Sequence, residues 1–289
     1  MPAQIGPYRL ERVLGEGSTA VVHRARHTID GTLVALKVLK THLATDETYR
    51  RRFLREARAA SEVSHPNLVA IMDHGESGGH YYLAAAYAVG GSLAAAIARH
   101  GRLPINETVH IASELASGLD ALHAHGILHR DVKAANAMLD VGGHAALTDF
   151  GLAKGQGYTA LTTIGQIVGS PAYLSPERIS RQETTPAGDI YALGCLVYEC
   201  LAGRPPFSAS SVFQLAVAHM TEDASSLTEM RRDVTPALDA AVRTAMAKDP
   251  ARRPVTAVGY AGRLFAAVHA TDGWSAPPAA RSPTPGSRP

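Results

Sequence analysis

The sequence predicts an α+β protein with a small β-rich N-terminal part and a larger helical C-terminal part. Short apolar segments separated by turn residues fill the first third of the chain, for example at 33–39 and 81–88. Apolar residues at helical spacing dominate the rest, above all at 105–124 and from Asp189 through Cys200. A chain of 289 residues is long enough for one large domain or for two lobes that share a cleft.

The composition is that of an ordinary globular protein in water, with 46% hydrophobic and 19% charged residues. A net charge of +2 does not favour nucleic acid or a membrane surface as a partner. Cys195 and Cys200 lie five positions apart in one apolar segment, which predicts no disulfide and a cytoplasmic location. The N-terminal residues lack the features of a signal peptide, and no apolar run approaches the roughly 20 residues that cross a bilayer. We therefore expect no membrane contact by this chain.

A glycine-containing turn joins the first two predicted strands. The strand at 8–14 ends at Gly15-Glu16-Gly17, and apolar residues resume through Val22. Glycine lets a backbone approach a phosphate closely and offer its N–H groups to the anion. Two glycines are also typical of an ordinary turn, so the weight of this signal depends on the residues that follow.

Lys37 ends an apolar strand, and Glu56 lies on the next predicted helix. That helix has Phe53 and Ala57 at helical spacing and Asp46 as its N-cap. A lysine that faces a cleft needs a counter-charge, for which Glu56 is the candidate. Lys37 alone or Glu56 alone would be interpreted as an ordinary solvent-exposed charge. Their order, on a strand and on the helix that follows it, favours an ion pair.

Polar side chains gather in the segment His-Arg-Asp-Val-Lys-Ala-Ala-Asn at 129–136 and in Asp-Phe-Gly at 149–151. Each segment follows a short apolar stretch typical of a buried strand that delivers side chains to a loop. Two carboxylates and an amide suit Mg²⁺, which takes oxygen ligands and shares them with phosphates. A carboxylate free of metal could accept a proton from a hydroxyl.

These two segments resemble the catalytic loop and the metal-binding loop of the eukaryotic-type protein kinases. The resemblance spans residues 8–268 and is nearest in appearance to bacterial serine/threonine-protein kinases, through Gly-Ser-Pro-Ala-Tyr-Leu-Ser-Pro-Glu at 169–177. It implies a bilobal fold with an N-lobe at about 8–86, a hinge at about 86–92 and a C-lobe at about 93–268. The Pro-, Ser- and Ala-rich residues 272–289 are expected to form a disordered tail or linker.

The resemblance also implies a role for each residue of the site. Asp131 would orient the substrate hydroxyl and accept its proton, and Lys133 would neutralise the phosphoryl group in transfer. Asn136 and Asp149 would hold Mg²⁺, with Mn²⁺ as a substitute. The residues implied for ATP are Leu14, Gly15, Glu16, Gly17, Val22, Ala35, Lys37, Glu56, Ala86, Ala88 and Ser92.

Two positions depart from the family pattern. Ala20 stands where a third glycine is usual, which would cost roughly 1–2 kcal/mol if a left-handed backbone were needed there. Ala85 stands at the back of the adenine pocket, where a larger side chain is usual. Ala85 is either drift in an alanine-rich chain or the source of a cavity that admits ATP with a bulky N6 substituent.

The loop between Gly151 and Glu177 carries candidate phosphorylation sites. Arg130, next to Asp131, invites a phosphate partner, so we expect autophosphorylation at Thr162 or Thr163. Thr159 is a weaker candidate for phosphorylation, and Ser170 is expected to have a structural role. Beyond this loop, Asp189 is expected to hydrogen-bond the catalytic-loop backbone. The resemblance also predicts a buried ion pair between Glu177 and Arg253.

The function expected is that of a serine/threonine protein kinase acting on protein substrates. A homodimer in which one copy phosphorylates the other is a further possible partner. A pseudokinase and a small-molecule phosphotransferase are the alternatives, and the intact set of polar residues and Lys133 disfavour them. A metal site at His123, His125 and His129 is rejected, because His129 belongs to the loop motif and is expected to be a core histidine. If the gene continues into a membrane anchor, this chain would be the cytoplasmic part.

Overall fold

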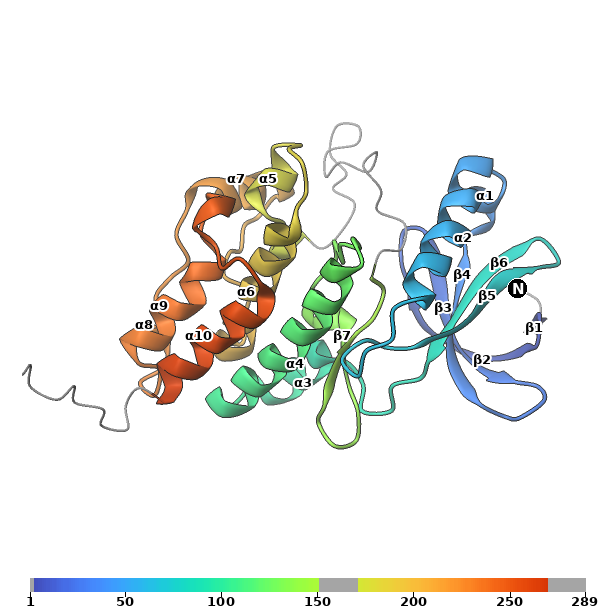
Figure 1. Ribbon diagram of the computed structural model, residues 1–289, viewed down its shortest axis with the longest axis horizontal. Coiled ribbons are helices and arrows are strands. Elements are labelled where there is room, and N and C mark those ends of the chain that lie inside the picture. Colours follow the sequence, from blue (N-terminus) through green and yellow to red (C-terminus); the bar gives the residue numbers. More distant parts are fainter. Residues whose placement is uncertain (1–2, 151–170, 270–289) are drawn as a thin grey trace, which may run out of the picture.

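The computed structural model describes residues 3–150 and 171–269. A twisted sheet with two helices beside it forms one part of the molecule, and a bundle of helices forms the other (Figure 1). The sheet contains only antiparallel pairs, in the order β1-β2-β3-β4-β6-β5. Its strands are β1 (Gln4–Ile5), β2 (Tyr8–Glu16), β3 (Ala20–His27), β4 (Leu33–Leu39), β5 (Ile71–Ser77) and β6 (His80–Ala86).

A tight turn joins β5 and β6. β5 ends at Ser77 and β6 begins at His80, so only Gly78 and Gly79 lie between the strands. Both glycines have positive φ (57° and 79°), the conformation that a two-residue hairpin of type I′ requires. The tight turn therefore adds Glu76 and Ser77 to the ladder.

Two helices follow β4: α1 (Thr41–Ala44) and α2 (Glu47–Ser61). Asp46 caps α2 as predicted, because its side chain accepts the N–H of Thr48 at 2.8 Å. The buried side of α2 includes Phe53 and Ala57, which pack with residues of the sheet. This packing places the helix that carries Glu56 on β5 and β6, and β6 is the sheet neighbour of β4, the strand that carries Lys37.

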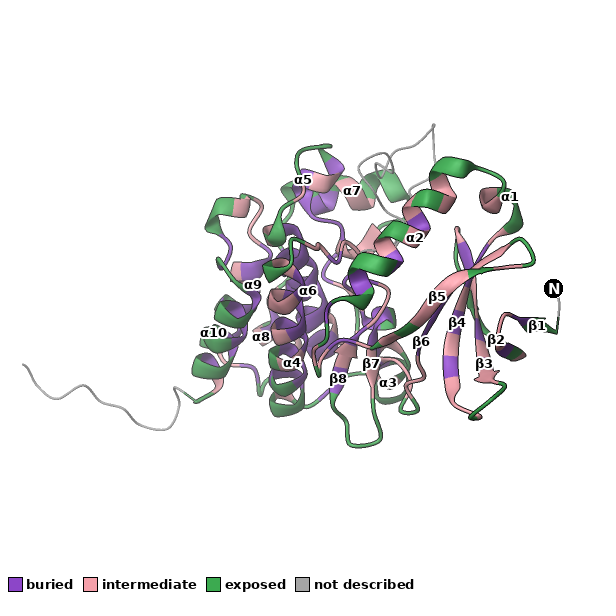
Figure 2. Cartoon of the chain, turned by 45° about the vertical axis from the view of Figure 1, so that its right-hand side comes forward, coloured by how far each residue is buried: buried purple, intermediate pink, exposed green. Residues whose placement is uncertain are grey.

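The helical part is built around α6 (Pro186–Ala202), which is buried along nearly its whole length (Figure 2). The all-round apolar sequence predicts this burial. The helix ends where Gly203 adopts a left-handed conformation (φ 76°), as expected for a C-terminal glycine. Cys195 and Cys200 are both free and buried within it. The surrounding helices are α3 (Leu93–His100), α4 (Ile105–Ala124), α5 (Pro176–Ile179), α7 (Val212–Thr221), α8 (Leu227–Met230), α9 (Pro236–Ala245) and α10 (Ala257–His269).

A small second sheet links the two parts. It consists of β7 (Ala137–Leu139) and β8 (Ala145–Leu147), and Leu147 exchanges backbone hydrogen bonds with Asn67 and Val69 at 2.9 and 2.8 Å. This pairing fixes the ends of β7 and β8 against the chain that leads into β5. Among the described residues, no helix combines the length and apolarity needed to cross a bilayer.

Candidate active site

The loop before β7 brings Asp131, Lys133 and Asn136 together. The Asp131 carboxylate accepts hydrogen bonds from Lys133 Nζ at 2.8 Å and from Asn136 Nδ2 at 3.0 Å. Asn136 Nδ2 also donates to the Asp131 carbonyl oxygen at 2.9 Å, which fixes the orientation of the amide. The amide oxygen of Asn136 is then the atom left to act as a ligand.

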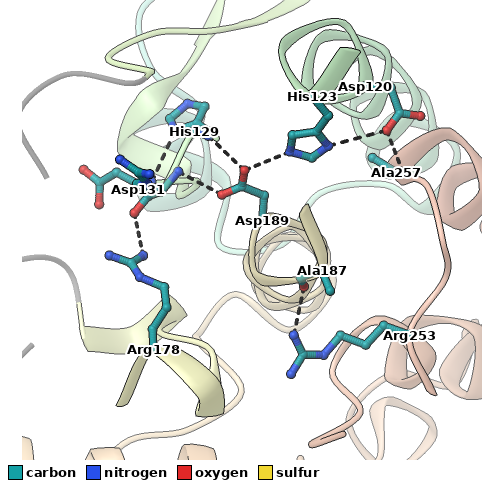
Figure 3. Close-up of polar contacts among 10 residues, drawn as sticks. Asp120, His123, His129, Asp131, Arg178, Ala187, Asp189, Arg253 and Ala257 are labelled. Carbon is teal, nitrogen blue, oxygen red and sulfur yellow. Dashed lines mark hydrogen bonds and ion pairs between the residues drawn. The ribbon is translucent and has the colours of Figure 1, made fainter. Parts of the chain in front are cut away.

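Asp189, at the start of α6, holds this loop in place (Figure 3). Its carboxylate accepts the backbone N–H groups of His129 at 2.9 Å and Arg130 at 2.8 Å, and it contacts His123 Nε2 at 2.9 Å. Burial on its own would raise the pKa of Asp189, but the hydrogen bonds from His123 and the Arg130 N–H hold that pKa below its usual value. The predicted bond between Asp189 and the catalytic-loop backbone is confirmed.

His129 is a core histidine, as the sequence indicates. It is 2% exposed, and its ring meets the edge of Phe150 with centroids 6.3 Å apart. Burial lowers the pKa of His129, so the ring is neutral near pH 7. The Asp131 N–H donates to His129 Nδ1 at 3.3 Å, which leaves the proton on the other ring nitrogen.

Two residues of the site adopt a backbone conformation that is uncommon outside glycine. Arg130 has φ 64° and Asp149 has φ 62°. Such conformations persist where surrounding contacts determine them, and they concentrate at functional sites. At Arg130 those contacts are visible: Asp189 holds its N–H, and Arg178 Nη1 donates to its carbonyl oxygen at 2.6 Å (Figure 3).

Asp149 and Asn136 are brought close by the backbone, because the Thr148 N–H donates to the Asn136 carbonyl oxygen at 2.9 Å. The pair offers a carboxylate and an amide oxygen, a donor set of the kind that Mg²⁺ prefers. This arrangement fits the two residues proposed as metal ligands.

The predicted ion pair between Lys37 and Glu56 is absent from this structure. Lys37 Nζ instead lies 3.0 Å from Asp149 Oδ1, across the two parts of the chain. Glu56 contacts Arg52 Nε at 3.1 Å, one turn earlier on α2. A partner at i–4 is always within reach on a helix, whereas contact with Lys37 depends on how α2 packs against the sheet.

The sheet register aligns the residues proposed for ATP. Val22 stands opposite Gly15 on one side and opposite Lys37 on the other. Ala20 begins β3 and is not among the described non-glycine residues with positive φ, so the expected cost of alanine does not arise. The remaining members also lie along these strands: Leu14, Glu16 and Gly17 at or beside the end of β2, and Ala35 in β4, paired with Ala85 of β6.

The segment between β6 and α3 contains the other proposed ATP residues. Ala86 ends β6, and its N–H donates to the Ala70 carbonyl oxygen at 2.9 Å. Ala88 lies in the following segment. Ser92 is the N-cap of α3, where its side chain accepts the Ala95 N–H at 3.2 Å. The structure thus shows a helix-capping role for Ser92, which the sequence analysis did not anticipate.

Glu177 and Arg253 form the predicted buried pair, with two parallel contacts of 2.8 Å each. Burial on its own would raise the pKa of Glu177, but the hydrogen bonds from Arg253 lower it below the usual value. Thr162 and Thr163, together with Thr159 and Ser170, lie outside the described residues, as does the predicted tail at 272–289.

Sequence reasoning missed two side chains that support the loop. Arg178 follows Glu177 directly and reaches the backbone of Arg130, but nothing in its sequence position indicates this contact. His123 entered the sequence analysis only as a rejected metal ligand, yet it bridges Asp189 to Asp120 (Figure 3). The Asp120 carboxylate in turn accepts two N–H groups at the start of α10.

Comparison with known proteins agrees with this geometry. A family model described as the protein kinase domain matches residues 8–261. Serine/threonine-protein kinase PknD of Mycobacterium tuberculosis is 38% identical over 268 residues, covering 92% of this chain and 40% of PknD. PknE of the same organism is 39% identical over 267 residues, covering 92% of this chain and 46% of PknE. The chain thus spans less than half the length of these curated relatives.

The solved structures give the same result for the fold. The crystal structure of the PknI kinase domain of Mycobacterium tuberculosis matches with a TM-score of 0.72 and 28% identity, covering 91% of this chain and 97% of that one. The helical and sheet parts described above are therefore the two lobes of a known architecture. The chain belongs to the eukaryotic-type protein kinase family, with bacterial serine/threonine kinases among its relatives.

Proposed function

We propose that this chain is the catalytic domain of a serine/threonine protein kinase, which transfers the γ-phosphoryl group of ATP to hydroxyl groups of proteins. The observation that carries the proposal is the cluster of Asp131, Lys133 and Asn136, with Lys37 and Asp149 paired beside it. These are the residue types that phosphoryl transfer needs, because the reaction depends on positioning and on charge stabilisation.

Each side chain has a defined task in this proposal. Asp131 orients the incoming hydroxyl and accepts its proton, and Lys133, already 2.8 Å from Asp131, neutralises charge on the phosphoryl group. The oxygen atoms of Asn136 and Asp149 hold the divalent cation, Mg²⁺ or its substitute Mn²⁺, which when bound neutralises phosphate charge. Lys37 binds the α- and β-phosphates.

The nucleotide itself is held mainly by backbone and apolar surface. We propose that Gly15, Glu16 and Gly17 cover the phosphates, while Leu14, Val22 and Ala35 contact the base. The Ala86 and Ala88 backbone groups would hydrogen-bond adenine, and Ser92 would lie near the ribose. The division into an N-lobe, a hinge and a C-lobe at about 8–86, 86–92 and 93–268 belongs to the same proposal.

Activation and location complete the proposal. Phosphorylation of Thr162 or Thr163, by a second copy of the chain in trans, would supply a partner for Arg130. The domain would work in the cytoplasm, where ATP is available, and act on protein substrates. The greater length of the relatives is consistent with further segments in the whole protein.

The test is phosphate mapping by mass spectrometry. The chain is first stripped with phosphatase and then given Mg²⁺ and ATP, with a protein substrate in one arm and Asp131→Asn in parallel. We expect new phosphate on Thr162 or Thr163 and on the substrate, in the parent only. ATP binding without any transfer would overturn the proposal in favour of a pseudokinase, and transfer only to free metabolites would favour a small-molecule phosphotransferase.

A further inference from the structure

Three potential metal ligands meet on the surface of the helical part, away from the loop of Asp131. His110 and Glu114 lie one turn apart on α4, and His144 lies in the turn that joins β7 to β8. Glu114 Oε1 is 3.4 Å from His110 Nε2 and 2.7 Å from His144 Nδ1. One ligand atom from each residue lies within 4.8 Å of the other two.

The carboxylate at the centre of this cluster is held in position. The second oxygen of Glu114 accepts the backbone N–H of Ala145 at 2.7 Å, and the Glu114 side chain is only 14% exposed. Asp140 accepts the backbone N–H of His144 at 2.9 Å and thereby shapes the turn. The His110 and His144 side chains are 60% and 66% exposed, so an ion could reach them without any opening of the fold.

The donor set selects a class of ion. Two imidazole nitrogens and one carboxylate oxygen suit zinc and its divalent transition-metal neighbours, whereas Mg²⁺ and Ca²⁺ prefer oxygen alone. Bonds of about 2.0–2.1 Å at tetrahedral angles separate neighbouring ligand atoms by roughly 3.3 Å. The distance of 3.4 Å between Glu114 Oε1 and His110 Nε2 already matches this separation. Small rotations of the two exposed imidazole rings would bring the other two ligand-to-ligand distances to it.

We propose that His110, Glu114 and His144 form a surface site for a divalent transition-metal ion of the zinc class, separate from the magnesium ligands Asn136 and Asp149. Solvent completes the coordination. The ion ties the β7–β8 turn to α4, two elements that are adjacent only in the folded chain. A bound ion therefore stabilises the native state by mass action, because the unfolded chain does not hold the three ligands together.

The direct test is calorimetric titration of the tag-free, chelator-stripped chain with Zn²⁺, in millimolar Mg²⁺ so that the oxygen ligands of the other site are occupied. We expect one tight equivalent in the parent. His110→Ala and His144→Ala should each weaken it by about tenfold or more, because loss of even an outer-shell partner of a metal ligand costs about 10–100-fold in affinity. His100→Ala is the matched control, because His100 is an exposed histidine at the end of α3 and should leave binding unchanged.

Thermal unfolding gives a second readout that does not depend on activity. At Zn²⁺ about 100-fold above Kd, the Tm of the parent should rise by roughly 5 °C or more, and that of Glu114→Gln should not. Glutamine keeps an oxygen for the Ala145 N–H, so the Tm of this variant without Zn²⁺ reports whether the turn stays folded. Equal Zn²⁺ affinity in the parent and the two histidine variants, or no binding in the parent, would overturn the proposal.

Discussion

The pair between Glu177 and Arg253 allows a quantitative test of the fold. The Arg253 side chain is 0% exposed and that of Glu177 is 3% exposed, so Glu177→Gln leaves a buried guanidinium without its counter-charge. Loss of one partner from such a pair costs about 3–5 kcal/mol. Arg253 still donates to the carbonyl oxygens of Ala187, Ala247 and Lys248, so we expect the lower end, about 3 kcal/mol. At roughly 2–4 °C per kcal/mol, the Tm should fall by about 6–12 °C.

The matched control is the exposed pair of Arg58 and Glu62, 3.8 Å apart with side chains 79% and 69% exposed. Glu62→Gln should change stability by less than about 1 kcal/mol in the same urea or thermal unfolding assay. Arg253→Met combined with Glu177→Met should recover part of the loss, because no buried charge then remains. A Glu177→Gln variant as stable as Glu62→Gln would refute the reasoning.

The same pair has a defined pH dependence. The pKa of Glu177 is lowered in the folded state, so its stabilising effect is fully present above its ordinary value of 4.5 and is lost as the pH falls through the lower, folded pKa. The stability difference between the parent and Glu177→Gln should therefore shrink below pH 4.5. A difference that stays constant through this acid range would contradict the lowered pKa.

Two further changes test the site. Asp189→Asn should leave at least one catalytic-loop N–H unpaired and destabilise the chain by about 1–3 kcal/mol. The same variant should lower kcat more than it raises the KM for ATP. An unchanged kcat would show that the loop does not depend on Asp189. Ala85→Met should abolish the use of ATP with a bulky N6 substituent while ATP itself is still used; equal turnover of the analogue by both forms would rule out a cavity at Ala85.

Much of the site was predictable because its residues are close in sequence. Asp131, Lys133 and Asn136 lie within one short loop, so their meeting in space follows from local chain geometry. The buried helix α6 was equally predictable, since a segment that is apolar on every side has to be buried. Two long-range contacts, those of Asp189 and of Glu177, were predicted only through the resemblance to protein kinases.

Other features depended on the tertiary structure. Lys37 pairs with Asp149, and Glu56 with Arg52, because the choice among several nearby charges depends on where α2 packs against the sheet. The sequence pattern and the spacing of residues give no information on how far Glu56 lies from Lys37.

The sequence by itself determined the order of elements, the composition of the catalytic loop and the buried helix, because these depend on local periodicity and neighbouring residues. Tertiary packing alone decided which distant side chains meet. It brought Arg178 to the backbone of Arg130 and placed His144 beside His110 and Glu114, residues 30 or more positions away in the chain. Such contacts arise from the docking of whole elements, so no single segment encodes them.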